Sequence, residues 1–373
     1  MKHLTYGGSS ASRTLGCPGW VKKSQNIPRR PAGQAAIDGS MHHEIMENCQ
    51  KNNETPDQLV GWTYQEDGTK REFTEDDLPL SEIAFHATNK LLDELNIDEL
   101  LIEPFVEMVS GSAGGSVDLL GLSEDRKTLL ILDYKFGSHK VSPKENPQGG
   151  VYGVSVMRDT STADMFNDVE KVVFAIVQPK VKGVVATWET DVAWLLDFEQ
   201  RFLEAMTSEY LSPGSHCKYC PAEPYCEAKR LNVMASALLD PKVTKDLQAA
   251  ADAVEEVESW VKAVHEELYM QINRGVPLEG WKVVEKRATR KWKDAGHIES
   301  DLNFAGLKKD DIFKHTILTP PQMEKMLKKN KVEFDLNEFI VSSSSGTTLA
   351  KADDSREAVV VSDVQGHLVD IMK

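Results

Sequence analysis

Three short apolar runs in the first half of the chain set the strongest limit on its fold. They cover residues 101–108, 116–122 and 128–134, and glycines or charged residues separate them. Runs of this length between turn residues are typical of consecutive strands in a meander. Helical patterns at 36–50 and 81–95 precede them; a helix at 147–157, strands at 171–178 and 183–187 and a helix at 191–210 follow. This order predicts an α/β core.

The composition changes beyond Leu239. Residues 243–273 form a long acidic helical pattern, a Trp-rich basic strand follows, and Thr319 with Pro320 and Pro321 precedes another helix to residue 329. We therefore expect a domain at 1–240, a mostly helical C-terminal extension at 241–341 and a partly flexible tail at 342–373. The tail includes the Ser/Gly-rich residues 342–348, and such a composition favours flexibility.

The charge of the chain is unevenly distributed. Its 59 acidic and 43 basic residues give a formal net charge of −16, which excludes nucleic-acid binding through overall positive charge. Residues 1–37 contain six Lys or Arg and no acid, and residues 281–293 contain six bases and one acid. Each stretch is a candidate phosphate-contacting strip, and an ordinary solvated face explains each equally well.

The sequence contains neither a membrane-spanning pattern nor a secretory leader pattern. No apolar run is long enough to cross a bilayer, and the N-terminal residues lack the charged start and apolar core of a signal peptide. We therefore expect a cytoplasmic protein with no membrane partner. The five cysteines are an odd number in such a chain, which argues against a disulfide framework.

Two aspartates and a lysine lie at the ends of two predicted strands. Asp118 lies within the second run, while Asp133 and Lys135 end the third. Because side chains alternate along a strand, Asp133 and Lys135 project from one face and Tyr134 from the other. Phosphodiester hydrolysis needs oxygen ligands for Mg²⁺ or Mn²⁺ and a cation near the developing charge, and these residues supply both. A salt-bridged surface pair is the alternative for Asp-x-Lys alone, and the buried run before it counts against that alternative.

Two predicted helices add polar residues to this set. His43 and Glu47 are four residues apart in the helix at 36–50 and therefore share a face, where an imidazole could complete a metal shell. His42 is a rival for that role, and a packed or solvated histidine is the common alternative. Gln148 and Tyr152 are likewise four apart at the start of the helix at 147–157.

The order of these residues resembles that of a known enzyme family. Gly39, His43 and Glu47, then Asp118, then Asp133-Tyr134-Lys135, then Gln148 and Tyr152 resemble the RecB-like branch of the PD-(D/E)XK nucleases, which includes AddB, CRISPR-adaptation nucleases and many phage exonucleases. The resemblance covers residues 17–226, and the joint pattern makes it specific. It implies a PD-(D/E)XK (restriction-endonuclease-like) core in a bacterial or phage-infected host cytoplasm.

The resemblance also implies roles for individual residues. His43, Asp118, Asp133 and the Tyr134 carbonyl would bind Mg²⁺ or Mn²⁺. Lys135 would position the attacking water or neutralise the transition state. Gln148 and Tyr152 would line the site toward DNA, and Glu47 is a further candidate.

The cysteines indicate a second metal centre. Cys217, Cys220 and Cys226 have the spacing C-x₂-C-x₅-C in a Pro-containing loop, which is a strong metal signal. The fourth ligand is either Cys17 or Cys49, and burial as a small apolar residue is a sufficient explanation for Cys49. Zinc is the usual metal of four thiolates, although the second close pair of a zinc ribbon is missing.

The arrangement of one distant and three clustered cysteines resembles the iron-sulfur members of the RecB-like family. It implies a [4Fe-4S] cluster on Cys17, Cys217, Cys220 and Cys226, with Zn²⁺ as the alternative. Such a centre would tie the two ends of the domain together and stabilise the fold.

These expectations indicate a metal-dependent deoxyribonuclease, more an exonuclease than an endonuclease. It would act on single- or double-stranded DNA in recombination, repair or phage DNA processing. The chain lacks a Gly-x₄-Gly-Lys-Ser/Thr phosphate loop, so a helicase would be a separate chain. A recombinase or an annealing protein would also be a separate partner chain. The alternative is a non-catalytic, iron-sulfur or zinc, DNA-binding recombination accessory protein.

The basic strand near Trp281 and Trp292 is similar to extensions of phage-encoded proteins of this type. Its aromatic and basic residues could stack on and clamp a strand. A basic strand on a helical domain explains the same residues equally well.

Overall fold

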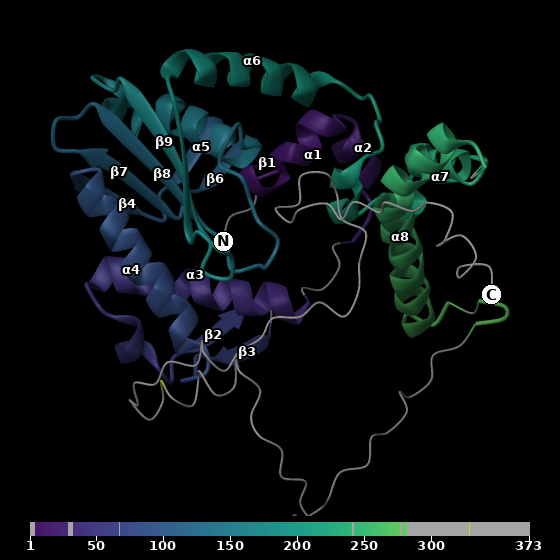
Figure 1. The fold of residues 1–373 in the computed structure, drawn as a ribbon, viewed down its shortest axis with the longest axis horizontal. Helices are drawn as coiled ribbons and strands as arrows, with labels where there is room; N and C mark the ends of the chain where they lie inside the picture. The colour runs from purple at the N-terminus through teal and green to yellow at the C-terminus, as the bar shows by residue number, and fades with distance from the viewer. Residues whose placement is uncertain are drawn as a thin grey trace, which may run out of the picture. The chain divides into compact units, whose positions relative to one another are not determined.

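The computed structural model of the chain describes residues 4–28, 33–66, 68–240, 242–276, 278–281 and 328. Its largest sheet, called the central sheet, is mixed and five-stranded with the order β10-β9-β8-β7-β4; β9, β8, β7 and β4 are labelled in Figure 1. The strands are β4 (Ile97–Ile102), β7 (Leu119–Ser123), β8 (Thr128–Tyr134), β9 (Lys171–Val177) and β10 (Val185–Thr190). Among the described strands of this sheet, only β8 and β9 are parallel neighbours. A parallel pair needs a crossover connection, and α5 (Pro147–Arg158) lies within it.

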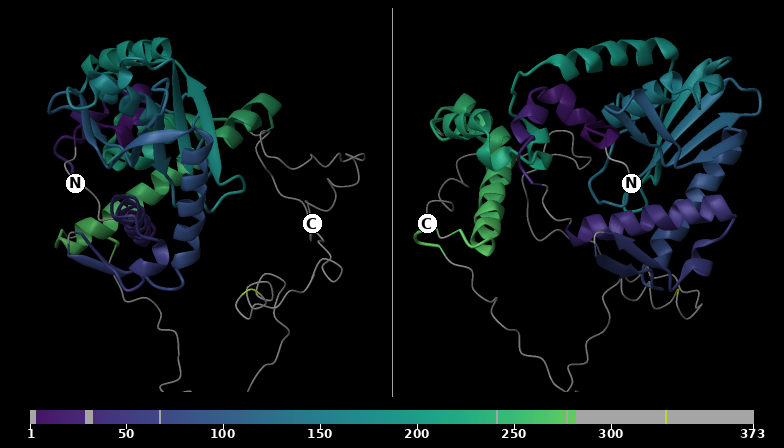
Figure 2. Two further views of the ribbon diagram at one scale, coloured as in Figure 1. Left: turned by 90° about the vertical axis from the view of Figure 1, so that its left-hand side faces the viewer. Right: turned by 180° about the vertical axis from the view of Figure 1, so that it is seen from behind.

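Helices cover both faces of this sheet, and β8 and β9 are therefore buried on both sides. On one face, Ile131 and Phe174 pack with residues of α5 and with Phe198 of α6 (Val192–Thr207). On the other face, Leu132 and Val173 pack with α4 (Leu78–Glu94) and with α3 (Gln34–Asn52). Figure 2 shows α6 and α4 on opposite sides of the sheet. The expected α/β architecture is confirmed.

Two of the expected strands are wrong in their extent. The runs at 101–108 and 116–122 each predict one strand, but each run is divided between two strands. The first run is divided between β4 and β5 (Phe105–Val109), and the second between β6 (Ala113–Ser116) and β7. β5 and β6 belong to a second sheet of order β1-β6-β5. Pro104 has no N–H to donate and Glu103 adopts a left-handed φ of 52°, so the first run bends there. The Glu103 N–H donates to the Asp118 carbonyl at 3.2 Å, and the Val117 N–H donates to the Pro104 carbonyl at 3.0 Å. The two bends therefore lie opposite each other.

The short second sheet and a hairpin complete the N-terminal half. β1 (Tyr6–Gly7) pairs with β6, and α1 (Ala11–Gly16) and α2 (Trp20–Ser24) follow it. The hairpin of β2 (Thr63–Glu66) and β3 (Thr69–Glu72) encloses a small core with α3, which includes Cys49 and Phe73. The N-terminal segment therefore reaches the sheet end at which Asp118 lies.

The compact unit with the sheet extends from Met1 to Val284, whereas the sequence suggested a boundary at residue 241. It includes α7 (Glu227–Ser236) and α8 (Thr244–Asn273), which pack together. Lys229, fully buried on α7, donates to Glu256 of α8 at 3.0 Å, and Ser259 of α8 donates to Glu223 at 2.7 Å. Three expected features lie outside the described residues: the helix to residue 329 except Lys328, the basic stretch at 281–293 except Trp281, and the tail at 342–373. None of the described helices is both long and apolar enough to span a membrane.

Candidate active site

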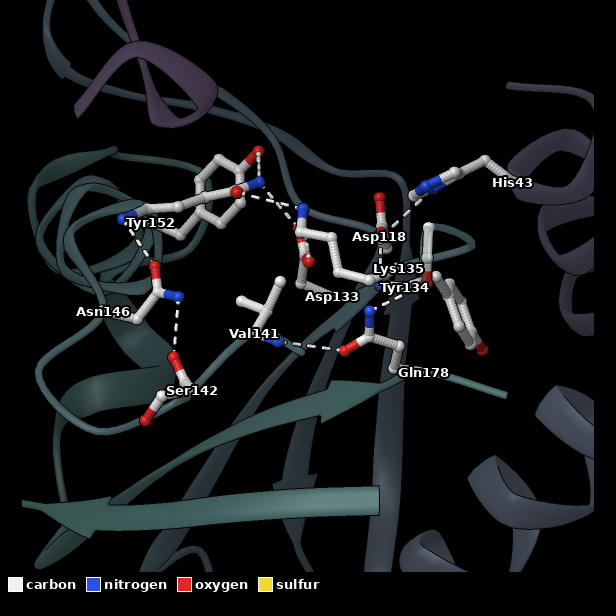
Figure 3. A network of polar contacts seen from close by, with 12 residues as sticks. His43, Asp118, Asp133, Tyr134, Lys135, Val141, Ser142, Asn146, Tyr152 and Gln178 are labelled. Carbon is white, nitrogen blue, oxygen red and sulfur yellow. Dashed lines mark hydrogen bonds and ion pairs between the residues drawn. The ribbon is translucent and has the colours of Figure 1, made fainter. Parts of the chain in front are cut away.

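Asp118 and Asp133 lie side by side at one end of the central sheet (Figure 3). Leu119 pairs with Leu132 in the register of β7 and β8, so Asp118, just before β7, comes next to the end of β8. The main-chain N–H of Tyr134 donates to Asp118 Oδ2 at 2.6 Å. The Tyr134 side chain turns to the opposite face, where its hydroxyl accepts a hydrogen bond from Thr88 at 3.1 Å. Strand alternation therefore separates the buried tyrosine ring from the two carboxylates.

A chain of polar contacts connects β8 with α5. Lys135 Nζ lies 2.6 Å from Asp133 Oδ2 and donates to Gln148 Oε1 at 3.0 Å. Gln148 Nε2 donates to Asp133 Oδ1 at 2.6 Å and to the Tyr152 hydroxyl at 3.1 Å. Asn146 caps α5 by accepting a hydrogen bond from the Gln148 N–H at 2.9 Å, which fixes Gln148 in the first turn. The four side chains therefore form one connected network.

Two further contacts hold this network in position. A Cβ added to Gly8 would lie 2.6 Å from the ring of Tyr152, so the N-terminal segment packs directly on that ring. Gln178, which the sequence analysis missed, fixes the loop between β8 and α5. It accepts a hydrogen bond from the Val141 N–H at 3.0 Å and donates to the carbonyls of Gly137 and His139 at 2.9 and 2.7 Å.

His43 approaches the same carboxylates from α3. Its Nδ1 lies 3.3 Å from Asp118 Oδ2 (Figure 3). Burial disfavours the imidazolium, but Asp118 outweighs burial and raises the pKa of His43. Burial likewise disfavours the Asp118 carboxylate, but His43 outweighs it and lowers the pKa of Asp118. Each partner therefore favours the charged form of the other.

The neighbouring His42 lies in the core instead. Its ring stacks on Phe136, with 4.7 Å between ring centroids, and its Nδ1 lies 2.9 Å from Ser81 Oγ. The sequence left both histidines as candidates. The structure brings His43 to Asp118 and leaves His42 within the protein interior.

We expect His42 to make the fold sensitive to mild acid. Burial lowers the pKa of His42 from 6.5 to about 4, so between these values the unfolded chain binds a proton that the folded chain does not. The stability that the neutral His42 gives the fold is fully present above pH 6.5 and is lost as the pH falls toward 4. The loss amounts to roughly 2 kcal/mol at about pH 5. Urea unfolding at about pH 7.5 and pH 5 measures the loss.

The matched variants are His42→Asn and His86→Asn, the second at an exposed position of α4. His42→Asn should remove most of the pH dependence, whatever it does to the stability at neutral pH. His86→Asn should retain it. Equal pH dependence in all three proteins would contradict the role of His42.

Four glutamates also line the cavity around these residues: Glu44, Glu47, Glu66 and Glu103. Glu103 lies at the first strand bend, where burial and then the charge of Asp118 raise the pKa of Glu103 to about 8. Glu103 is not predicted from the sequence because the apolar run at 101–108 is typical of a single strand, although Pro104 indicates the bend. Glu47 pairs with Lys51 on α3 at 2.6 Å.

The cavity has a volume of about 940 Å³ and joins distant parts of the chain. Its lining includes His43, Asp118, Asp133, Lys135, Gln148 and Tyr152, all from the set identified in the sequence. The lining also includes Arg13 and Trp20 from the N-terminal helices, and Lys218, Tyr219, Cys220 and Pro221 from the cysteine-containing segment. The cysteine segment is therefore part of the cavity that contains the acidic residues.

The donor atoms of the cavity suit a hard divalent cation. Asp133 Oδ2 is buried and accepts no directed hydrogen bond, although Lys135 lies close enough for an ion pair. A buried carboxylate oxygen without a hydrogen-bond donor fits a metal ligand. As the described side chains lie, no three His, Cys, Asp or Glu converge on a single point at metal-binding spacing; His43 pairs with Asp118 and Lys135 pairs with Asp133.

The structure brings three of the cysteines together. Burial lowers the pKa of Arg13, and three sulfurs close to its guanidinium act in the opposite direction. They belong to Cys17, Cys217 and Cys220. The main-chain N–H groups of Ser212 and Gly214 lie 3.4 Å from Cys17 Sγ and 3.5 Å from Cys217 Sγ. Hydrogen bonds to sulfur are typical around metal-bound thiolates. The described cysteines form no disulfide.

The other two cysteines differ from this group. Cys226 is half-buried immediately before α7, and its sulfur accepts no hydrogen bond from the described residues. Cys49 lies in the small core of α3 and the hairpin, where burial raises its pKa to about 12. His216, which the sequence analysis did not single out, has its pKa raised by a hydrogen bond with the Cys17 thiol.

The chain overlaps with two solved structures of an alkaline exonuclease (LHK-Exo) from Laribacter hongkongensis. One covers 62% of this chain and 98% of that chain, at 15% identity and a TM-score of 0.23. The other, a complex with dAMP, has the same coverage, 16% identity and a TM-score of 0.23. Because these scores are low, the function proposed below depends on the geometry of the cavity and not on this overlap.

A family comparison covers nearly the whole chain. Residues 3–357 match the family described as "Protein of unknown function (DUF2800)". The chain belongs to the DUF2800 family.

Proposed function

We propose that this protein is a divalent-metal-dependent deoxyribonuclease with a PD-(D/E)XK-type active centre. The observation that carries the proposal is the convergence of Asp118, Asp133 and Lys135 in one cavity, with Gln148 connecting Lys135 to Asp133. Paired carboxylates and a cation in a partly buried cavity are the groups that phosphodiester hydrolysis needs.

Asp118, Asp133, His43 and the Tyr134 carbonyl would hold Mg²⁺ or Mn²⁺. When bound, the ion supplies Lewis-acid stabilisation of the phosphate and lowers the pKa of a coordinated water. The hydrogen bond from the Tyr134 N–H to Asp118 Oδ2 holds the first of these carboxylates in place. Gln148 holds the second through Asp133 Oδ1.

Lys135 would stabilise the charge that develops on the phosphate. Burial works against its ammonium group, but Asp133 and then Asp118 outweigh burial and raise the pKa of Lys135. The side chain therefore stays protonated at neutral pH. Gln148 fixes Nζ by accepting its hydrogen bond at 3.0 Å, so little reorganisation is required during the reaction.

Gln148 and Tyr152 would position the DNA strand beside this centre. Burial raises the pKa of Tyr152, so its hydroxyl remains a neutral hydrogen-bond donor. Glu47 would limit how closely a phosphate can approach the α3 side of the cavity, because like charges repel. Glu103 would add little to this repulsion at neutral pH, because its pKa is raised to about 8.

The proposed context is recombination, repair or phage DNA processing in a bacterial or phage-infected host cytoplasm. The substrate would be single- or double-stranded DNA, and exonuclease action is favoured over endonuclease action by the resemblance to the RecB-like nucleases. A helicase, recombinase or annealing protein would be a separate chain.

We further propose that Cys17, Cys217, Cys220 and Cys226 bind a structural [4Fe-4S] cluster, with Zn²⁺ as the alternative. The proximity of three sulfurs to Arg13 and the N–H groups directed at two of them support thiolate ligation. Cys226 would be the fourth ligand by its spacing in the sequence.

End-labelled DNA provides the test of the nuclease proposal. We expect the purified protein to degrade linear DNA with Mg²⁺ or Mn²⁺ and to stop when EDTA is added. Mononucleotide products would indicate an exonuclease, and internal fragments would indicate an endonuclease. A protein that binds DNA but cleaves neither single nor double strands with either metal would contradict the proposal and favour the non-catalytic accessory role.

A further inference from the structure

The turn that contains two of the clustered cysteines forms part of the cavity wall. Lys218 and Tyr219 lie between Cys217 and Cys220, and η4 (Ser215–Tyr219) contains both of them. Both residues line the same cavity as Asp118 and Asp133. The turn is therefore next to the place where the proposed function puts a DNA strand.

The backbone of this turn is fixed while one large side chain is free. Arg13 donates a hydrogen bond to the Tyr219 carbonyl, and its guanidinium lies 3.9 Å from the centre of the Trp20 ring. The Cys220 N–H donates to the Cys217 carbonyl at 2.8 Å. The Tyr219 side chain is nevertheless 72% exposed. A rigid backbone with an exposed ring resembles a stacking platform more than a packing residue.

Lys218 is the cation of this wall that is free to meet a phosphate. Among the cavity cations, Lys135 pairs with Asp133, and Arg13 is held against Trp20 and the Tyr219 carbonyl. Lys218 makes no ion pair with any described residue; its Nζ lies 5.7 Å from the Tyr219 ring centre. A free ammonium beside an exposed ring combines the two contacts that bind a single strand without sequence preference.

We propose that Tyr219 stacks on an unpaired DNA base at the entrance of the cavity and that Lys218 contacts the adjoining phosphate. This inference rests on the proposed nuclease function and names the form of DNA that the site takes: a strand with unpaired bases. A base inside a duplex is stacked on its neighbours and offers no free face to Tyr219. The wall formed by the cysteine turn therefore favours single-stranded over blunt duplex DNA.

Binding in an Asp133→Asn background, with Mg²⁺ present, tests the inference without cleavage. The probes are a single-stranded oligodeoxynucleotide with 2-aminopurine at its end and a blunt duplex of the same sequence. Tyr219→Ala should weaken single-strand binding by roughly 5- to 150-fold and abolish quenching of the 2-aminopurine. Duplex affinity should change by less than about threefold. Tyr219→Trp should retain the quenching.

Two more variants complete the design. Tyr210→Ala removes a tyrosine that is 70% exposed but does not line the cavity, and it should bind both probes as the parent does. Lys218→Ala should reduce the slope of log affinity against log salt by about 0.7, the effect of one phosphate contact with a single strand.

The outcomes separate this inference from the nuclease proposal. Unchanged quenching in Tyr219→Ala, or equal losses for single strand and duplex, would overturn the stacking role. Failure of the Asp133→Asn parent to bind either probe would overturn it as well. Cleavage by the wild-type protein is measured separately. A stacking defect in Tyr219→Ala without wild-type cleavage would contradict the nuclease proposal alone. Wild-type cleavage without a stacking defect in Tyr219→Ala would contradict the stacking role alone.

Discussion

Asp133→Asn is expected to lower the rate of DNA cleavage by roughly a thousandfold or more while the protein remains folded. The substitution removes the charge from Asp133 Oδ2, the buried oxygen that accepts no directed hydrogen bond. Lewis-acid stabilisation of a phosphate by a bound metal contributes several kcal/mol, and about 1.4 kcal/mol corresponds to a tenfold change in rate. Rates with end-labelled DNA and Mg²⁺ provide the measurement.

The folded state should tolerate this change because the charge of Asp133 is costly. Burial, reinforced by Asp118, raises the pKa of Asp133 despite the nearby ammonium of Lys135, so the fold disfavours the ionised carboxylate. Asparagine retains the oxygen that accepts from Gln148 Nε2. Lys135 keeps its hydrogen bond to Gln148 Oε1 and remains near the charge of Asp118. This gain is offset because the asparagine Nδ2 replaces the oxygen that lies 2.6 Å from Lys135 Nζ and the ion pair is lost. We therefore expect a melting temperature close to that of the wild type.

Asp197→Asn is the matched control. Asp197 is an exposed carboxylate on α6 that pairs with Arg201 at 2.8 Å, so the same chemical change there should leave the cleavage rate within about twofold. Wild-type cleavage by Asp133→Asn would remove Asp133 from the active site. A large drop in its melting temperature would contradict the argument that burial of the charge is costly.

Much of the arrangement around Asp133 follows from local periodicity. Alternation along β8 was sufficient to predict that Asp133 and Lys135 share a face, and their 2.6 Å contact agrees with this. The spacing of four residues predicted that Gln148 and Tyr152 lie together on a helix, and a hydrogen bond of 3.1 Å joins them. Such relations involve neighbours in the sequence and require no knowledge of the tertiary fold.

The features that the sequence did not predict depend on distant contacts. Glu103 reaches the cavity because Pro104 and Val117 bend two strands toward each other, and neither bend is visible in the apolar pattern alone. The composition shift near Leu239 suggested a domain boundary. However, Glu256 lies beyond that shift and pairs with the buried Lys229, so α8 belongs to the compact unit. Packing between segments decides both cases.

The cysteine turn illustrates the same limit. Its spacing predicts a metal site, but only the fold shows that Tyr219 and Cys220 line the cavity of Asp118 and Asp133. The hydrogen bond between the Ser212 N–H and Cys17 Sγ connects residues 195 positions apart. The sequence gives no sign that the cysteine turn and the acidic residues meet; the structure places residues 218–221 in the wall of the cavity that contains Asp118 and Asp133.

Cys17→Ala is therefore expected to have the second large effect, on metal content and on stability. Through the proposed metal, Cys17 would be connected to Cys217 and Cys220. The chain between them, which is nearly the whole domain, would then form a closed loop. By analogy with a covalent cross-link, closure of a loop of this length stabilises the folded state by about 5 kcal/mol. The total stability of a domain is roughly 5–15 kcal/mol, so much of the protein should unfold or lose solubility.

Cys49→Ala offers a closely matched control, since both cysteines are buried, with exposures of 7% for Cys17 and 1% for Cys49. Loss of the Cys49 sulfur from its small apolar core should cost on the order of 1 kcal/mol and leave the metal content unchanged. Anaerobic purification followed by iron, sulfide and zinc analysis distinguishes the two variants. Urea unfolding measures their stability.

The same measurements decide which residues and which metal form the centre. We expect iron and sulfide to fall in Cys17→Ala and in Cys226→Ala, and to stay at the wild-type level in Cys49→Ala. Full metal content in Cys17→Ala would remove the residue from the ligand set, and stoichiometric zinc without iron would replace the cluster with the alternative. Because Cys17, Cys217 and Cys220 surround Arg13, which holds the Tyr219 carbonyl, loss of the metal should also displace the cavity wall. Single-strand binding should then fall in Cys17→Ala even though Asp118, Asp133 and Lys135 are all present.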